Sequence, residues 1–361
     1  MRIAQIAPLH EGCPPRYYGG TERVVSYLTE ELVALGHDVT LFASGDSRTS
    51  AQLVPICPRA LRLDSAVLDP LIYHLVMFNR VAARAAEFDI LHFHTDYLHF
   101  PVFAGLGLPT VTTLHGRLDL PDLPVAYAEF PEMPLVSISD NQRLPLPWAN
   151  WRATVHHGLP RNLYGLGSGA GGYLAFIGRI SPEKRLDRAI DIAGCVGMPL
   201  KIAAKVDRVD RDYFEAVIRP LLDRSGVEFL GEISDAEKGP FLGEAAALLF
   251  PIDWPEPFGL AMIEAMANGT PAIAFRCGAV PEVIDEGITG FIVDDVAAAV
   301  AAVAPAVALS RAAVRRRFER RFAADRMARD YLTVYEGLVD GAVPALPESN
   351  GTEQKRIVSA L

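Results

Sequence analysis

Residues 254–271 read WPEPFGLAMIEAMANGTP and follow the apolar run AALLFP at 246–251. The apolar run predicts a short buried strand, because it contains no polar residue and ends at a proline. Pro255 and Pro257 hold the next residues out of a helix, which we expect to begin near Phe258. A strand, a loop and an apolar helix in this order form one unit of a parallel sheet, so the stretch predicts an α/β fold.

Two carboxylates interrupt this apolar stretch. Glu256 lies in the predicted loop and Glu264 lies one turn beyond Leu260 in the predicted helix. A buried glutamate is rare unless a partner or ligand holds it. We expect both acids to face a cleft, where carboxylate oxygens can accept hydrogen bonds from vicinal hydroxyl groups. The alternative is a buried ion pair for one acid and solvent exposure for the other.

The same alternation of strands and helices extends through the rest of the second half. Ser181 and Pro182 predict the N-cap and first residue of a helix, and Ser234 with Glu237 forms a capping-box pattern. Further strands are predicted at YLAFIG (173–178), KIAAKV (201–206), VEFLG (227–231), PAIAF (271–275) and GFIV (290–293).

The first half shows a similar pattern. A helix is predicted from Thr21, with apolar residues on one face and Gly36 at its end, and a second helix is predicted around 69–88. Strands are predicted at RIAQIAP (2–8), DVTLFAS (38–44), DILHFHT (89–95), PTVTTLHG (109–116) and LVSIS (135–139). The chain therefore predicts two Rossmann-like, doubly wound domains, with a cleft at the carboxyl ends of both sheets.

The glycine-rich segment GSGAGG at 167–172 is the predicted joint. We expect an N-terminal domain over 1–165 and a C-terminal domain over 166–322. A last helix over 323–340 carries an apolar face that can pack back on the N-terminal domain, and residues 341–361 form a predicted disordered tail.

Composition excludes several function classes. The chain has 361 residues, more than one ordinary core needs, and its net charge of −10 argues against nucleic acid as a partner. Four widely spaced cysteines predict neither a zinc site nor a disulfide framework. No apolar run reaches the roughly 20 residues of a membrane helix. We expect a cytoplasmic protein, with peripheral contact at the inner face of a membrane as the alternative.

Two segments predict anion binding at the N-terminal ends of helices. Gly178 and Arg179 end a predicted strand, and Lys184 falls in the first turn of the predicted helix that follows. A cation there opposes the helix dipole unless an anion joins it, so Arg179 and Lys184 are candidates to hold a diphosphate. The alternative is two solvated surface cations. Gly19 and Gly20, before the first helix, allow close approach of a ligand, although a glycine pair is weak on its own.

Other polar residues have plainer explanations. His115 ends a strand at the cleft. His92 and His94 have the spacing of an H-x-H metal pair, but no third ligand pattern lies nearby, so they are interpreted as hydrogen-bonded strand residues.

Asp210 and Asp212 have the D-x-D spacing of a metal–nucleotide motif, but Asp210 precedes a predicted helix and is interpreted as its cap. Glu282, in the first turn of another predicted helix, is also interpreted as a cap. The basic run over 315–321 is interpreted as a solvated helix face, with an anionic-lipid patch as the lesser alternative.

Taken together, YYGGTERVV, FIGRISPEKR, PEPFGLAMIEAMANGTPAIA and GAVPEVI resemble the glycosyltransferase family 4 of GT-B enzymes, from Arg2 to about Val339. The resemblance implies retaining, metal-independent transfer of a sugar from a nucleotide-diphosphate donor. UDP is the default nucleotide, and the acceptor is a glycan, a lipid-linked sugar or a small metabolite. The second domain is then expected to bind the donor and the first the acceptor.

The resemblance also assigns roles to particular residues. Glu264 is expected to bind the ribose and Glu256 the transferred sugar, with His115 facing that sugar from across the cleft. Gly19 and Gly20 approach the phosphates or the acceptor. Arg179 and Lys184 hold the diphosphate, and Phe258, Gly259 and Leu260 offer backbone amides to the sugar.

This chain also departs from the family pattern at two positions. It has Ala279 where relatives often have a second glycine, and we expect the added methyl near the sugar or phosphate. Ala204 before Lys205 leaves Lys205 as a candidate donor contact only.

Three other functions stay open at this point. A nucleotide-sugar epimerase or a glycosyl phosphorylase can use the same fold, and a sugar-nucleotide binding protein can lack catalysis. A retaining hydrolase would need two carboxylates about 5 Å apart beside the scissile bond, which suits Glu256 and Glu264 poorly.

Overall fold

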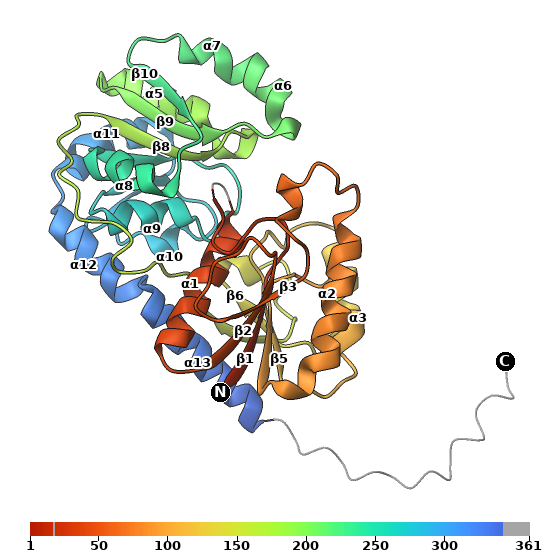
Figure 1. Cartoon of the computed structure of the whole chain (residues 1–361). Coiled ribbons are helices and arrows are strands. Elements are labelled where there is room, and N and C mark those ends of the chain that lie inside the picture. Colours follow the sequence, from red (N-terminus) through yellow and green to blue (C-terminus); the bar gives the residue numbers. More distant parts are fainter. Residues whose placement is uncertain (17–18, 342–361) are drawn as a thin grey trace, which may run out of the picture.

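The chain folds into two lobes, each built on one parallel sheet (Figure 1). A computed structural model describes residues 1–16 and 19–341. Tyr18 and, apart from Gly341, the expected tail over 341–361 lie outside the described residues. The two doubly wound parallel sheets confirm the fold class that the sequence predicts.

The first lobe contains a seven-stranded sheet in the order β3-β2-β1-β4-β5-β6-β7. Its strands are β1 (Arg2–Ile6), β2 (Asp38–Ala43), β3 (Gln52–Pro55), β4 (Ile90–Phe93), β5 (Thr110–Thr113), β6 (Leu135–Ser137) and β7 (Trp151–Thr154). Its helices are α1 (Gly20–Ala34), α2 (Pro70–Arg84), α3 (Phe100–Phe103) and α4 (Leu123–Glu129), with 3₁₀ turns η1 (Leu61–Leu63), η2 (Ala85–Glu87) and η3 (Asn141–Arg143). The edge strands β3 and β7 were not expected from the sequence.

The second lobe contains a six-stranded sheet in the order β10-β9-β8-β11-β12-β13. Its strands are β8 (Leu174–Arg179), β9 (Leu200–Lys205), β10 (Val227–Gly231), β11 (Ala247–Phe250), β12 (Ala272–Phe275) and β13 (Gly290–Val293). All of these strands pair in parallel, so their carboxyl ends share one edge, and that edge faces the first lobe.

Helices cover both faces of the second sheet. They are α5 (Leu186–Val196), α6 (Arg211–Tyr213), α7 (Arg219–Leu222), α8 (Asp235–Glu244), α9 (Leu260–Ala267), α10 (Val280–Val283), α11 (Val296–Val307) and α12 (Arg311–Arg321). Short turns η4 (Pro182–Lys184) and η5 (Arg208–Asp210) and the π-helical segment η6 (Phe214–Ile218) lie between them. The predicted capping box is present at Ser234 and Glu237, at the start of α8.

The chain crosses between the lobes twice, and the two crossings lie side by side. The Leu159 amide donates to the Phe322 carbonyl and the Ala324 amide donates to the Leu159 carbonyl, each at 2.9 Å. A side chain at Gly158 would come within 2.6 Å of the Ala323 carbonyl oxygen, so this close approach requires glycine. After the second crossing, α13 (Ala324–Asp340) lies against α1 of the first lobe (Figure 1).

Apolar packing joins the lobes through this helix. Tyr331 and Tyr335 of α13 are completely buried, and they belong to a cluster that includes residues of β1, α1 and α9. A second apolar cluster packs against the first sheet, and a third packs against the second sheet. The apolar face predicted for the last helix therefore packs into the core of the first lobe, although the helix follows the second lobe in the chain.

Candidate active site

One large cavity lies between the lobes, and both lobes line it. Its volume is about 560 Å³, within the range of small-molecule sites. Every residue that the sequence proposed for the site lines this cavity: Gly19, Gly20, His115, Gly178, Arg179, Lys184, Glu256, Phe258, Gly259, Leu260 and Glu264. The cavity sits at the carboxyl ends of both sheets, where open α/β folds bind ligands.

Arg179 ends β8 and enters the cavity among three acids. Its guanidinium donates to Glu183 at 2.7 Å and lies 3.3 Å from Asp210 and 4.0 Å from Asp207. Asp210 makes no side-chain hydrogen bond to the helix it precedes, so its interpretation as a cap was wrong. The ion pair with Arg179 takes its place, because a strand and a turn far apart in sequence bring the two charges together.

Lys184 lies in a different position from the one predicted. Pro182 opens the 3₁₀ turn η4, Arg185 adopts left-handed backbone angles with φ of 53°, and α5 starts only at Leu186. Lys184 therefore lies before the helix rather than in its first turn. Its ammonium group forms an ion pair with Glu256 and lies 5.1 Å from the ring centre of Trp254.

Trp254 fixes the carboxylate of Glu256. The indole N–H donates to Glu256 Oε2 at 2.9 Å, and the Glu256 side chain is only 14% exposed. The backbone beside it is held by the loop before α10, since the Ala279 amide donates to the Glu256 carbonyl at 2.9 Å. A side chain at Gly278 would come within 2.3 Å of Glu256 backbone atoms, and Gly278 has φ of 55°.

These contacts bear on the second glycine position of the family pattern. Ala279 is fully buried and is not among the residues that line the cavity, which differs from the expected position of its methyl near a ligand. Lys205 does line the cavity, and its ammonium group lies 3.0 Å from Asp207.

Glu264 lies on α9 and joins a chain of charges that reaches the other lobe. The Lys238 ammonium group donates to Glu264 at 2.9 Å and lies 3.4 Å from Asp235. Asp235 in turn pairs with Arg23 of α1. Glu264 is only 5% exposed, so this acid forms the buried ion pair that the sequence left open as an alternative.

The two lobes approach each other closely at Gly20 and the start of α9. A side chain added at Gly20 would lie 3.5 Å from Leu260 of the opposite lobe. Gly259 precedes α9 with φ of 86°. The amides of Leu260 and Ala261 begin the helix, so no preceding turn supplies them with a carbonyl, and they are available to a ligand.

The first lobe presents histidines to the same cavity. His94 and His115 contact each other through Nδ1 and Nε2 at 2.9 Å, and the rings of His115 and His157 stack with centres 5.2 Å apart. Burial lowers the pKa of His115 to about 3 and holds the pKa values of His94 and His157 well below the usual range. These three histidines are therefore neutral at physiological pH.

His92 and His94 are hydrogen-bonded in and beside strand β4, as the sequence interpretation stated. His92 contacts Tyr335 and Thr113, each at 2.7 Å, and His94 contacts Gln5 at 2.8 Å. Among residues 1–16 and 19–341, no group of three or more His, Cys, Asp or Glu side chains has a geometry that could hold a metal ion.

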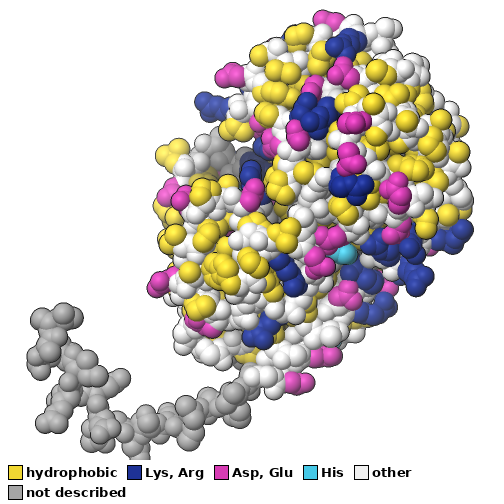
Figure 2. All heavy atoms as spheres, turned by 180° about the vertical axis from the view of Figure 1, so that it is seen from behind, with side chains coloured by type: hydrophobic (Ala, Val, Ile, Leu, Met, Phe, Trp, Pro, Cys, Tyr) yellow, Lys and Arg dark blue, Asp and Glu magenta, His cyan; other side chains and the backbone are white. Residues whose placement is uncertain are grey.

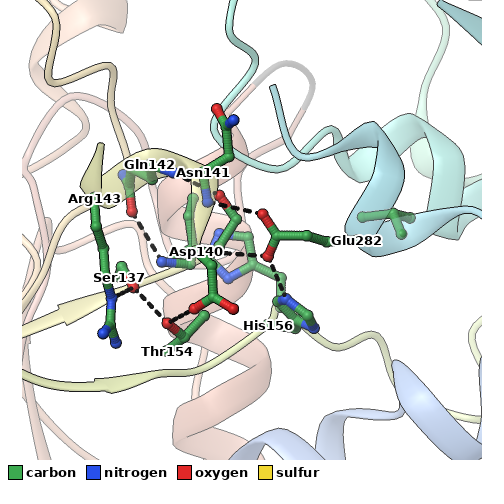
Figure 3. A network of polar contacts seen from close by, with 12 residues as sticks. Ser137, Asp140, Asn141, Gln142, Arg143, Thr154, His156 and Glu282 are labelled. Carbon is green, nitrogen blue, oxygen red and sulfur yellow. Dashed lines mark hydrogen bonds and ion pairs between the residues drawn. The ribbon is translucent and has the colours of Figure 1, made fainter. Parts of the chain in front are cut away.

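Glu282 joins the lobes rather than capping its own helix (Figure 3). Its carboxylate accepts hydrogen bonds from the backbone amides of Asp140 and Asn141, each at 2.8 Å, and lies 3.2 Å from His156 Nε2. The interpretation of Glu282 as a cap was therefore wrong. Its position in the first turn of α10 gave no sign that its partners belong to the first lobe.

The basic run over 315–321 is also more engaged than expected. Figure 2 shows Lys and Arg side chains gathered on the flank where α12 lies. Arg315 donates to the Tyr164 carbonyl at 2.7 Å, and Arg317 and Arg321 both pair with Asp285. Only part of this run is a solvated face.

No described helix is by itself long and apolar enough to cross a bilayer. Within the described part of the chain, α11 and α12 taken together meet that test by length and composition, and they are bent by 100° at the break between them.

The sequence reasoning missed several residues of the cavity. Lys238 lies in the first turn of α8, where a cation opposes the helix dipole, so the argument applied to Lys184 would have found it. Trp254 precedes the motif directly, but its contact with Glu256 depends on a side-chain direction that spacing does not give. On the first lobe the cavity is lined by His10, Arg62, His74, Asp96 and Leu98.

Comparisons with known proteins follow the two-lobed architecture. Residues 18–159 match the family described as "Glycosyltransferase Family 4", and residues 169–321 match the family described as "Glycosyl transferases group 1". The two matches fall on the first and second lobes respectively and leave residues 1–17, 160–168 and 322–361 unmatched.

Individual relatives are distant. A 41.2 kDa protein from the cps region of Klebsiella pneumoniae is 28% identical over 34% of this chain and 32% of its own length. D-inositol 3-phosphate glycosyltransferase of Mycolicibacterium smegmatis is 24% identical over 76% of this chain and 75% of its own length.

A solved structure shows the same fold across nearly the whole chain. HepE of Anabaena, determined in complex with UDP-glucose, superposes with a TM-score of 0.68 at 16% identity and covers 93% of this chain and 100% of its own. The family matches and the shared architecture show that the chain belongs to the family 4 glycosyltransferases of the GT-B fold.

Proposed function

We propose that this protein transfers a sugar, with retention of anomeric configuration and without a metal ion, from a UDP-sugar to a hydroxyl group of an acceptor. The observation that carries the proposal is one cavity in which two cations, a helix N-terminus and two carboxylates converge from several βα loops. HepE, which shares the fold, binds UDP-glucose, and this supports the choice of donor class.

The diphosphate belongs beside Arg179 and Lys184. Breaking the anomeric bond leaves negative charge on the departing diphosphate, and preorganised cations stabilise that charge. Both cations have acidic partners within the protein: Lys184 pairs with Glu256, and Arg179 pairs with Glu183 and Asp210. Donor binding therefore exchanges a carboxylate partner for a phosphate partner, which limits the cost of desolvating the cations.

The nucleoside and the sugar belong on opposite sides of the diphosphate. Glu264 accepts hydrogen bonds from the ribose hydroxyls once Lys238 shares its carboxylate. Glu256, released from Lys184 and still held by Trp254, accepts from a hydroxyl of the transferred sugar. The amides at the start of α9 donate to the same sugar, and His115 faces it from the first lobe.

The acceptor belongs on the first-lobe side of the cavity. His10, Arg62 and His74 line it there, and the guanidinium of Arg62 lies 3.1 Å from Glu11. The segment over 117–150, which the sequence left without an interpretation, contributes Ile138 to the lining. The acceptor therefore meets residues from separate segments of the first lobe, including η1 and α2, and none of these segments forms a recognisable sequence motif.

A thermal-shift screen of UDP, GDP and ADP tests the donor site. Stabilisation grows with the ratio of ligand concentration to Kd, so the correct nucleotide raises the melting temperature most. We expect UDP to give the largest shift and Glu264→Gln to weaken UDP binding roughly tenfold while leaving pyrophosphate binding unchanged, because only the nucleoside meets Glu264. If none of the three nucleotides shifts the melting temperature, the donor-site proposal fails.

Product analysis separates transfer from its alternatives. With donor and acceptor present, we expect a glycoside whose anomeric configuration matches the donor, and the same yield with and without EDTA. A new sugar formed from donor alone would instead indicate an epimerase. Dependence of the product on inorganic phosphate would indicate a phosphorylase.

A further inference from the structure

A continuous chain of hydrogen bonds runs from the cavity through the first sheet to the last helix. It begins at His115 and ends at Tyr331 of α13, and the members behind His115 are at most 2% exposed. The links are His115–His94 (2.9 Å), His94–Gln5 (2.8 Å), Gln5–Tyr335 (3.1 Å), Tyr335–His92 (2.7 Å), His92–Thr113 (2.7 Å) and Thr113–Tyr331 (2.9 Å).

The amide of Gln5 fixes the direction of the first links. Its oxygen Oε1 can only accept, so His94 Nε2 carries a proton and donates to it. A neutral imidazole has one protonated nitrogen, so His94 Nδ1 is an acceptor. His115 Nε2, which is the atom that contacts His94 Nδ1, must therefore carry its proton and donate.

The remaining links have the same direction. Gln5 Nε2 donates to the Tyr335 oxygen, which leaves the Tyr335 hydroxyl to donate to His92 Nδ1. His92 Nε2 then donates to Thr113. Burial keeps His92 and His94 uncharged, since it lowers both pKa values well below the usual range. Each link thus agrees with the next, and the opposite direction would require the Gln5 amide to turn over.

This direction leaves one atom of His115 with nothing to bind. With the proton on Nε2, Nδ1 holds a lone pair, and within residues 1–16 and 19–341 this atom is shielded from solvent and has no hydrogen-bond partner. His115 lines the cavity. A buried acceptor without a partner costs free energy, so the position favours a ligand group that donates a hydrogen bond.

We propose that Gln5, His94 and Tyr335 are positioning residues that hold His115 as the Nε2-protonated tautomer, so that His115 Nδ1 accepts a hydrogen bond from a hydroxyl group of the donor sugar. The choice of the sugar as ligand rests on the proposed function. The tautomer itself does not, because it follows from contacts within the chain. A hydroxyl group suits this site, whereas a carboxylate, a carbonyl or a fluorine can only accept and leaves Nδ1 unpaired.

Nitrogen-15 NMR of the histidine side chains tests the tautomer directly in the full-length protein. Protonated and unprotonated imidazole nitrogens resonate far apart, and a His115→Asn sample identifies the signals of His115. We expect Nε2–H and an unprotonated Nδ1 at pH 7 in the free protein. An Nδ1–H signal, or equal populations of the two tautomers, would overturn the proposal.

Two substitutions on the same helix separate positioning from packing. Tyr335→Phe removes the shorter of the two contacts that orient the Gln5 amide nitrogen and leaves only the one to His92 Nδ1 at 3.4 Å. The amide can then turn over more easily, and a population of Nδ1-protonated His115 should appear. Tyr331→Phe removes an equally buried hydroxyl at the far end of the chain and should leave His115 unchanged. Gln5→Met, which removes the amide itself, should repeat the effect of Tyr335→Phe. If all three variants keep the wild-type tautomer, the network does not set it.

The ligand part of the proposal has its own readout. We measure the affinities of UDP, UDP-glucose and a series of UDP-glucose analogues in which one hydroxyl at a time is replaced by fluorine. In the wild type, one replacement should weaken binding roughly three- to tenfold, and in Tyr335→Phe this penalty should be smaller while UDP affinity stays the same. Equal penalties in the two proteins, or UDP-glucose binding no tighter than UDP, would overturn the sugar contact. Failure of UDP itself to bind would defeat the proposed function and leave the tautomer result standing.

Discussion

The two walls of the cavity differ in how they carry charge. On the second lobe every cation named for the site has an acid beside it: Lys184 has Glu256, and Lys238 has Glu264. On the first lobe the facing side chains include stacked, neutral histidines that burial keeps from taking up protons. One wall can exchange ionic partners with a charged ligand, whereas the other distinguishes ligands by the direction of its hydrogen bonds.

Lowering the pH should charge the histidines of the first-lobe wall and so remove this difference between the walls. The resulting loss of folding stability is the largest effect we expect. All nine histidines lie in residues 10–157, and burial lowers the pKa of His10 to about 4 and that of His115 to about 3. The unfolded chain takes up protons below about pH 6.5, whereas the native state does not until those lower values. The stability is therefore fully present above pH 6.5 and is lost as the pH falls toward 4.

The size of the loss follows from the number of histidines. Each histidine whose pKa burial lowers contributes about 1.4 kcal/mol over the whole interval from pH 7.5 to 5.5, so several together cost on the order of 5 kcal/mol. Urea unfolding at the two pH values measures the change in the free energy of unfolding. Hydrogen exchange, corrected for the intrinsic rate, should show that the first lobe loses protection while the second lobe, which has no histidine, keeps it. Equal loss in both lobes would contradict the explanation.

Removing the cations of the second-lobe wall is the next largest test. Arg179→Ala with Lys184→Ala should lower kcat/KM by about a thousandfold or more and abolish the melting-temperature shift with UDP, because the leaving diphosphate loses its stabilising charge. The substitutions also leave Glu183, Asp210 and Glu256 without their ionic partners, so the cavity then repels the donor.

Lys201→Ala is the matched control for the double variant. Lys201 lies on the same sheet, pairs with Glu228 at 3.3 Å and does not line the cavity. It should change neither kcat/KM nor the UDP shift. A double variant that retains UDP binding would mean that the diphosphate lies elsewhere in the cavity.

In the first sheet the sequence predicted the inner strands better than the edges, whereas in the second sheet it predicted both edge strands, β10 and β13. Strand β11, ALLF, is a continuous apolar run and all four of its residues are buried, as expected for a parallel strand with helices on both faces. The missed strands β3 and β7 lie at the two edges of the first sheet, where QLVP and WRAT are only partly buried and lack such a run. An edge strand pairs on one side only, so its residues are under weaker selection for burial.

For the site, the sequence predicted which residues line the cavity but not which side chains pair with them. Backbone position at a βα turn decides whether a residue faces the cleft, and residue spacing reports that position. Asp210 and Glu282 were both interpreted as helix caps because a cap needs only local sequence. Their actual partners, Arg179 and the amides of Asp140 and Asn141, are distant in sequence, and no local pattern reports such a contact.

The smallest effect we expect concerns Glu282, a site-adjacent acid whose partners lie on the opposite lobe (Figure 3). Burial opposes its ionised form, but the hydrogen bonds from His156 and the two backbone amides outweigh burial and lower the pKa of the carboxyl. Glu282→Gln leaves one amide without a charged acceptor, which should lower the free energy of unfolding by about 1 kcal/mol. Because the lost bonds join the lobes, small-angle scattering should also show a larger radius of gyration.

Glu286→Gln distinguishes the loss of an interlobe contact from the loss of any carboxylate. Glu286 accepts from the Ile292 amide at 2.9 Å within its own lobe. Glu286→Gln should have a comparable or smaller effect on stability and should change neither the radius of gyration nor the KM for the donor. Glu282→Gln should raise that KM a few-fold, because the two walls of the cavity no longer meet as closely. Identical behaviour of the two variants would show that Glu282 stabilises α10 alone. The packing of α13 and the paired crossings at Leu159 and Ala324 would then be sufficient to hold the lobes together.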